Sequence, residues 1–139
     1  MDTQTCNKQN YYVGICLLLC LLFTQCSSEN KTKEASIYLE KEAQNINRQC
    51  PAKIDAVTSL DSCAHKQENI LVYYYTVNDT CIFDKSDFEG RQIPNLIEIM
   101  KTSPEMSGLR NYNTTINHRY NDRNGKLFYS FSINPQDYK

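Results

Sequence analysis

The sequence contains no tryptophan, only four glycines and four prolines, and no excess of charge of either sign. Fifteen basic residues against sixteen acidic ones leave a formal net charge of −1, so no basic surface is available to hold the phosphates of a nucleic acid. The scarcity of glycine and proline, with 40% hydrophobic residues, excludes a low-complexity or disordered chain. A chain of 139 residues forms one domain with at most a short leader or tail.

The motifs that mark common enzyme classes are also missing. The sequence has no G-x-G-x-x-G or P-loop for phosphates, no H-E-x-x-H or C-x-x-C for metals, and no G-x-S-x-G for a nucleophilic serine. Two histidines are few for a zinc site, which usually takes four protein ligands. We therefore expect a protein that is not an enzyme and that holds neither a metal nor another cofactor.

The longest hydrophobic run is too short for a transmembrane helix. Residues 13–23 read VGICLLLCLLF and contain neither charge nor proline, whereas a helix that spans a bilayer needs about 20 apolar residues. The run predicts the core of a signal peptide, with an uncleaved signal anchor as the alternative. After it come Thr24, Gln25 and Cys26, and from there the chain is hydrophilic.

An apolar run that stops at a cysteine resembles the signal of bacterial lipoproteins. In that family a peptidase cuts just before the cysteine, which then receives acyl chains such as palmitate. The resemblance implies that residues 1–25 are removed and that Cys26 is lipidated. Gln25 and Phe23 depart from the small residue and the leucine that the family prefers there, and the residues after Cys26 resemble lipoproteins of Bacteroidota. The implied location is the cell envelope, on the periplasmic or surface side of the outer membrane, with the acyl chains holding the protein to the membrane.

The polar residues 26–34 predict a tether, and residues 35–139 predict a single α+β domain. The domain starts with a helix that Thr32 caps and Pro51 ends. The apolar positions of this helix recur every three or four residues, which is the spacing of one buried face. They are Ala35, Leu39, Ala43, Ile46 and Cys50.

Two strands follow, at residues 53–64 and 70–77, and the polar letters KQEN form the turn between them. A second helical zone spans residues 88–102; Ser86 and Glu89 predict a capping box, and Pro94 predicts a kink or restart. Ser103 and Pro104 predict the beginning of a further short helix.

The last part of the chain predicts a β-hairpin, because Asn124-Gly125 lies between two alternating runs. The predicted pairs are Tyr120 with Tyr129, His118 with Phe131 and Ile116 with Ile133, all on one buried face with Leu127. The strands ILVYYYTVN and KLFYSFSIN are also alike at an offset of 56 residues, although any two amphipathic strands share such a pattern. We expect two helix-strand-strand units that form a four-stranded antiparallel sheet with helices packed on one face.

The seven cysteines divide by position. Cys6, Cys16 and Cys20 lie in the leader and Cys26 at the lipidation site, which leaves three in the domain. The strand arrangement brings Cys81 near Cys50, so we expect a Cys50–Cys81 disulfide in an exported protein, with Cys63 as a free thiol.

Cys63 and His65 lie two residues apart and point to the same side of a strand. This pattern leaves a small envelope enzyme, with Cys63 as nucleophile, as an alternative function. His118 is expected to be a packed histidine of the sheet rather than a base.

The tyrosines of the second strand predict a binding surface. Tyr73 and Tyr75 take the core side, so Tyr74 faces outward. The residues expected to form an apolar strip on the sheet face that the helices leave open are Val57, Cys63, Ile70, Val72, Tyr74 and Phe128. Such a face meets a protein partner, a second subunit or a ligand. A third layer, or a dimer formed only for stability, is the alternative, and the sequence does not determine the oligomeric state.

These patterns favour a lipid-anchored envelope protein that acts by binding, as an accessory, inhibitor-like or immunity-like module, with the membrane and a protein as its partners. A secreted eukaryotic or viral glycoprotein is a further alternative, because Asn78 and Asn113 lie in glycosylation sequons.

Overall fold

The structure, a computed structural model, describes residues 26–139. The expected signal peptide, residues 1–25, lies outside the described residues. Cys26, the expected lipidation site, is the first residue of helix α2, and residues 35–139 form one compact unit. Among residues 26–139, no helix combines the length and the apolar character that crossing a membrane requires.

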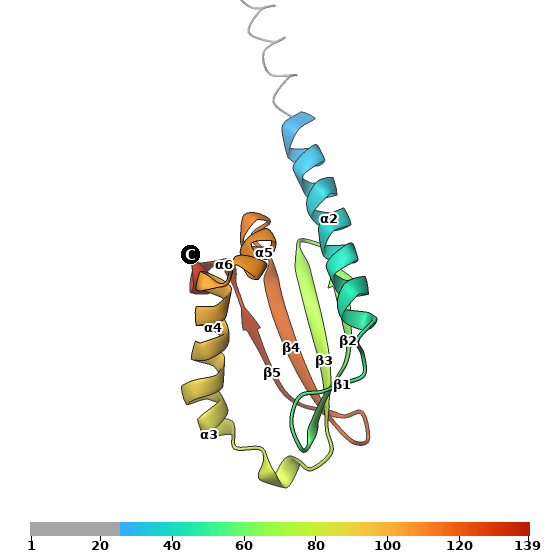
Figure 1. The fold of residues 1–139 in the computed structure, drawn as a ribbon, viewed down its shortest axis with the longest axis vertical. Coiled ribbons are helices and arrows are strands. Elements are labelled where there is room, and N and C mark those ends of the chain that lie inside the picture. The colour runs from blue at the N-terminus through green and yellow to red at the C-terminus, as the bar shows by residue number, and fades with distance from the viewer. Residues whose placement is uncertain (1–25) are drawn as a thin grey trace, which may run out of the picture. The chain divides into compact units, whose positions relative to one another are not determined.

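The domain contains five strands and several helices (Figure 1). The strands are β1 (Ala52–Lys53), β2 (Thr58–Lys66), β3 (Ile70–Val77), β4 (Thr115–Asp122) and β5 (Leu127–Ile133). The α-helices are α2 (Cys26–Asn47), α3 (Lys85–Asp87), α4 (Ile93–Thr102), α5 (Ser107–Asn111) and α6 (Pro135–Tyr138). Three short helices of other types are η1 (Thr80–Ile82), η2 (Phe88–Gln92) and η3 (Pro104–Met106).

The α+β class is confirmed, but the expected four-stranded antiparallel sheet is wrong. The sheet has five strands in the order β1-β2-β3-β4-β5, and β3 pairs with β4 in parallel. The helices between β3 and β4 cause this difference, because a helical crossover returns the chain to the end of the sheet from which it left. The order of helix, strand and strand does occur twice, with the short β1 as an additional edge strand.

The C-terminal hairpin follows its prediction. β4 and β5 are antiparallel, and all three predicted pairs are present: Tyr120 with Tyr129, His118 with Phe131 and Ile116 with Ile133. Gly125 in the turn has φ +78°, a conformation that glycine adopts without strain. A β-bulge next to Tyr120 then pairs Leu127 with Asn121 and leaves Leu127 40% exposed, so Leu127 does not share the buried face as expected.

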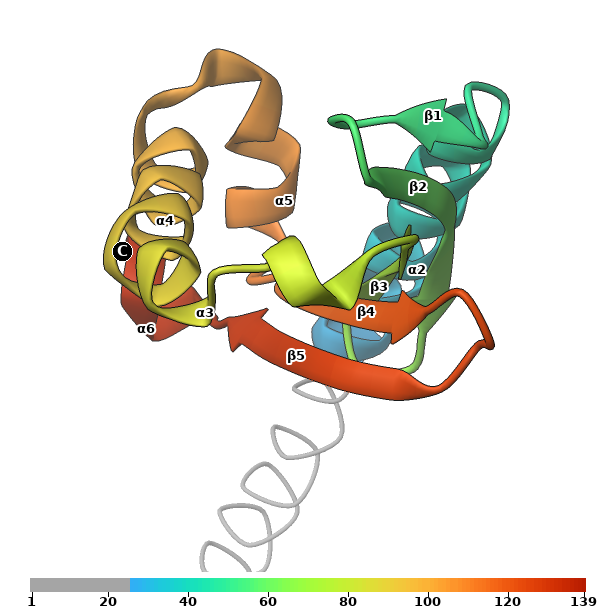
Figure 2. The ribbon, with the colours of Figure 1, turned by 90° about the horizontal axis from the view of Figure 1, so that it is seen from below.

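The helices pack on one face of the sheet (Figure 2), and the two layers share a hydrophobic core. Three of the predicted positions of the first helix, Ala35, Leu39 and Ala43, are buried, as the spacing indicated. The helix begins at Cys26 rather than after Thr32, and it ends at Asn47, before Pro51. The core of this face contains Leu39, Ala43, Cys63, Leu71, Met100, Leu109, Ile116, Ile133 and Tyr138.

A second, mainly aromatic cluster extends the core along β3, β4 and β5. Its buried members are Tyr75, Val77 and Tyr120. The rings of Tyr75 and Tyr120 stack with centroids 4.5 Å apart. His118 stacks on Phe131 at the same distance and is 6% exposed, so it is packed within the sheet as predicted.

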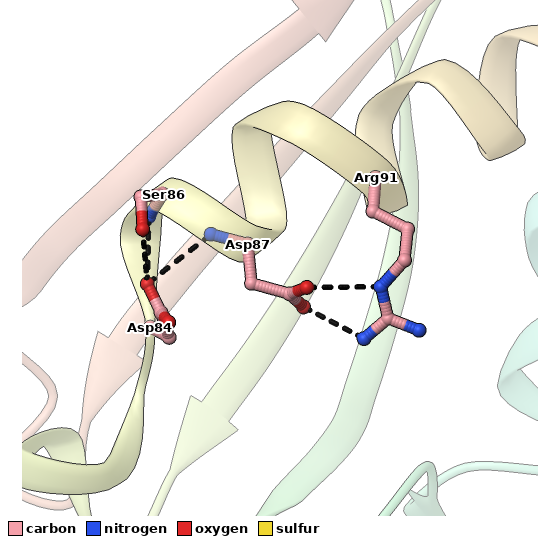
Figure 3. A network of polar contacts seen from close by, with 4 residues as sticks. All are labelled: Asp84, Ser86, Asp87 and Arg91. Atoms are coloured by element: carbon pink, nitrogen blue, oxygen red, sulfur yellow. Dashed lines mark hydrogen bonds and ion pairs between the residues drawn. The ribbon is translucent and has the colours of Figure 1, made fainter.

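The segment from α3 to α4 differs in detail from its prediction (Figure 3). Asp84, not Ser86, caps α3. Its carboxylate accepts hydrogen bonds from the Ser86 hydroxyl and from the backbone N–H groups of Asp87 and Ser86, and these bonds lower the pKa of Asp84. Arg91 makes a bidentate contact with Asp87. The π-helix η2 separates α3 from α4, and α4 restarts at Ile93 with Pro94 in its first turn, as the proline indicated.

Candidate functional site

The six residues of the predicted apolar strip do not lie together. Ile70, Val72 and Tyr74 alternate along β3 and share the sheet face opposite the helices. Val57 packs against the aromatic cluster, and Cys63 is a member of the core under the helices. These two positions are therefore corrections to the predicted strip.

Phe128 is the third correction. It lies beside the β-bulge of β5 and makes an edge contact with Phe83, a residue packed against the aromatic cluster, with centroids 5.1 Å apart. It also lines a hollow of about 450 Å³ along β5 with Ile93 and Leu127. Phe128 is 37% exposed, but it belongs to this edge rather than to the open face.

The error at Cys63 follows from the length of one turn. Lys66 pairs with Ile70, so three residues form the turn, and Cys63 pairs with Tyr73 rather than with an outward residue. A shift of one residue in the register moves every side chain of a strand to the other face. Glu68 and Asn69 in this turn have positive φ values without being glycine, and the sequence therefore carries no strong signal for its geometry.

The open face forms a shallow hollow of about 340 Å³ around Val72 and Tyr74. Val72 is 6% exposed and lies at its floor, whereas Tyr74 is half-buried. The parallel register places Arg119 of β4 directly opposite Tyr74, and Lys66 lies at the end of β2. The hollow is thus an apolar and aromatic floor beside two cationic side chains.

Small polar residues also line the hollow, together with His118 and Phe131. Ser130 and Ser132 come from β5, and Ser132 donates a hydrogen bond to Asn117 across 2.7 Å. Among the described residues that line the hollow, none carries a carboxylate, and both Lys66 and Arg119 are exposed. Asp61, which lies elsewhere on β2, accepts a hydrogen bond from Thr76 at 2.7 Å. The hollow is therefore suited to an apolar group that carries or adjoins an anion.

Sequence reasoning missed Lys66 and Arg119 as members of this face. The alternation of β4 places Arg119 outside the buried series of Ile116, His118 and Tyr120, which is a usable signal. Its position beside Tyr74, however, depends on the parallel pairing of β3 and β4, which the predicted antiparallel sheet did not contain.

The domain cysteines are all free thiols in the structure. Cys50 is half-buried, Cys63 buried and Cys81 exposed, and the expected Cys50–Cys81 disulfide is not present. Burial raises the pKa of the Cys63 thiol to about 12, which disfavours the nucleophilic thiolate. His65 lies on the same strand face as predicted, but its Nδ1 is 3.7 Å from a carboxylate oxygen of Glu40.

Two further titratable features belong to the packing. The Tyr75 hydroxyl and His118 Nδ1 are 3.1 Å apart in the core, and burial lowers the pKa of His118 to about 4. His118 is therefore neutral at physiological pH. Within residues 26–139, no three histidine, cysteine, aspartate or glutamate side chains converge in a way that could hold a metal ion.

Comparison with family models finds a match, and comparison with curated protein sequences finds none. A family model described as "Domain of unknown function (DUF8479)" matches residues 34–129, which is most of the domain. No curated protein sequence matches the chain.

Several solved structures share the fold. A protein of Pseudomonas aeruginosa described as secreted superposes with a TM-score of 0.66 at 13% identity, over 78% of this chain and 96% of its own. The pilotin EpsS of the type 2 secretion system of Vibrio vulnificus gives 0.64 at 9% identity, over 80% and 97%. The type II secretion pilotin AspS of Vibrio cholerae gives 0.61 at 7% identity, over 80% and 98%. At these identities the likeness establishes the fold alone.

Proposed function

The chain belongs to the DUF8479 family, whose function is unknown, and we propose that it is a non-catalytic accessory module of the bacterial envelope. In this proposal Cys26 carries acyl chains that hold the protein at the outer membrane, and the open sheet face binds a protein partner. The fold is shared by secretion pilotins and by a secreted protein, which supports an envelope role.

The observation that carries the proposal is the hollow on the open sheet face. Val72 and Tyr74 supply an apolar floor, and Lys66 and Arg119 supply positive charge beside it. Charges of one sign at an interface select partners of the other sign and increase the rate of association. We infer that the partner presents a segment in which an apolar side chain lies next to a carboxylate.

The absence of catalysis is part of the proposal. Cys63, the alternative nucleophile, is 2% exposed and has a strongly raised pKa. A reactive cysteine needs exposure and a thiolate, and Cys63 has neither in the folded domain. Binding on the opposite face should therefore not require this thiol.

The anchor is tested by intact mass spectrometry of the protein extracted from membranes. We expect a mass that starts at Cys26 and includes acyl chains, and a Cys26→Ala variant that is neither processed nor acylated. A full-length, unmodified mass for the natural chain would contradict the anchor.

The binding face is tested by photo-crosslinking in cells that make the natural protein. A photoreactive phenylalanine derivative replaces Tyr74 in one strain and Ile37 in another; Ile37 is 62% exposed on α2 and serves as the matched control. We expect a discrete adduct from position 74 that Arg119→Glu abolishes and Cys63→Ala leaves intact. Equal crosslinking from both positions, or an adduct that Arg119→Glu does not change, would contradict the proposed face.

A further inference from the structure

The structure brings Cys50 close to Cys63 at the C-terminal end of α2. β1 and β2 are antiparallel, with Ala52 opposite Leu60. When this register is followed from Ala52 toward the N-terminus, Cys50 comes to lie opposite Ser62, one residue from Cys63 along β2. After burial, the largest contribution to the raised pKa of the Cys63 thiol is the charge of Cys50, which requires the two thiols to be close to each other.

Asn47 independently ties the two cysteines to one place. Its backbone carbonyl accepts a hydrogen bond from the N–H group of Cys50 at 3.2 Å. Its side-chain amide bonds both backbone groups of Cys63: Oδ1 accepts from the N–H group at 2.7 Å, and Nδ2 donates to the carbonyl at 2.8 Å. Asn47, the last residue of α2, is therefore hydrogen-bonded to both Cys50 and Cys63 and holds their backbones near each other.

We infer that Cys50 and Cys63 form the disulfide of this domain when the protein folds in an oxidising compartment. One Sγ–Sγ bond forms, the two thiols lose two protons and two electrons, and a disulfide of a thiol-disulfide oxidoreductase or of glutathione is reduced to two thiols. The bond attaches the segment between α2 and β2 covalently to the sheet.

Cys81 is left out of this pair. It is exposed in η1, where its N–H group donates to the carboxylate of Asp79 at 3.0 Å. Cys81 follows β3, whereas Cys50 and Cys63 are both held by Asn47. Cys81 therefore stays available to an alkylating reagent.

The burial of the pair indicates when the bond forms. Cys63 is 2% exposed, and desolvation raises the pKa of both thiols, so the folded, reduced domain reacts slowly with an oxidant. The bond forms during folding, before α2 covers Cys63. The inference rests on the proposed function only in that export supplies the oxidising compartment in the cell.

The test is a tryptic map of the full chain after refolding. The denatured, reduced protein is refolded in mild detergent with reduced and oxidised glutathione, alkylated, and digested without reductant. Trypsin cuts after Arg48, Lys53, Lys66 and Lys85, and so places the three cysteines of the domain in separate peptides, 49–53, 54–66 and 67–85. Because glutathione replaces the envelope, this experiment does not depend on the proposed location.

We expect peptide 49–53 to be linked to peptide 54–66, and peptide 67–85 to be alkylated. An alkylated peptide 49–53, or its linkage to any other peptide, would overturn the inference. The Cys81→Ser variant should keep the linkage, and Cys50→Ser should leave peptide 54–66 alkylated while the domain still folds. Reduction should lower the melting temperature of the natural chain by roughly 10 °C and leave that of Cys50→Ser unchanged.

Discussion

Tyr74 and Tyr75 are neighbours in the chain, but they lie on opposite faces of the sheet and in different surroundings. Tyr75 is 8% exposed, stacks on Tyr120 and contacts His118 through its hydroxyl group. Tyr74 is half-buried beside Arg119 on the open face. Because a strand alternates its side chains, one residue type stabilises the fold at one position and is available for binding at the next. The position of a tyrosine within the alternation therefore matters more than its presence in the sequence.

The largest expected effect compares these two tyrosines directly. Tyr75→Ala should lower the free energy of unfolding by about 3–5 kcal/mol, because it removes a buried ring and leaves a cavity. Tyr74→Ala should lower it by less than about 1 kcal/mol, because its face is open. Urea denaturation of both variants measures the difference. Equal losses would mean that the two faces are equally packed.

A second prediction uses pH, since only the helix-covered face contains a buried histidine. The pKa of His118 is about 4 in the folded domain and about 6.5 when unfolded, so the unfolded state binds more protons between these values. The free energy of unfolding is therefore highest above pH 6.5 and decreases by about 3 kcal/mol as the pH falls toward 4.

The control for this prediction is the other histidine of the domain. The pH dependence between 6.5 and 4 should flatten in His118→Gln and persist in His65→Gln, as measured by denaturant unfolding at several pH values. A natural chain whose stability is constant across this range would show that His118 is not buried in its neutral form.

The two hairpins show what the sequence could predict. Asn124-Gly125 allows few turn geometries, so the pairs of β4 and β5 from Ile116 to Tyr120 followed correctly from the chain, and only the β-bulge next to the turn was missed. The turn between β2 and β3 contains no glycine, and an error of one residue there placed Cys63 on the wrong face. The residues of a turn therefore predicted the strand pairing only where the turn contained a glycine.

The candidate site was predictable in part for the same reason. The alternation of β3 correctly grouped Ile70, Val72 and Tyr74. Arg119 joins them only through the parallel pairing of β3 with β4, which depends on the helices between these strands rather than on either strand. The approach of Cys50 to Cys63 likewise depends on Asn47. The spacing of residues in the sequence does not predict the hydrogen bonds that its side chain makes to Cys63.

The third prediction concerns Asn47, which connects α2 to the covered face. Asn47→Ala leaves the N–H and carbonyl groups of Cys63 without their side-chain partners, and each buried unpaired group costs about 1–3 kcal/mol. We expect a loss of about 2 kcal/mol under reducing conditions. Asn45→Ala, two residues earlier on the same helix, should cost less than about 0.5 kcal/mol, because Asn45 only accepts a long, exposed hydrogen bond from Arg48. Similar losses of stability in Asn47→Ala and Asn45→Ala would mean that the side chain of Asn47 does not help to hold α2 on the sheet.

The smallest effect on stability is expected on the open face, where the effect on binding is expected to be largest. Lys66 and Arg119 are exposed beside the hollow, and a charge change at such a position is usually within about 0.5 kcal/mol of neutral. Lys66→Glu and Arg119→Glu should therefore unfold at nearly the same urea concentration as the natural chain, while the crosslink from position 74 is lost. A loss above about 1.5 kcal/mol in either variant would mean that the cation supports the fold. The open face would then resemble the covered one, with its side chains serving packing rather than recognition.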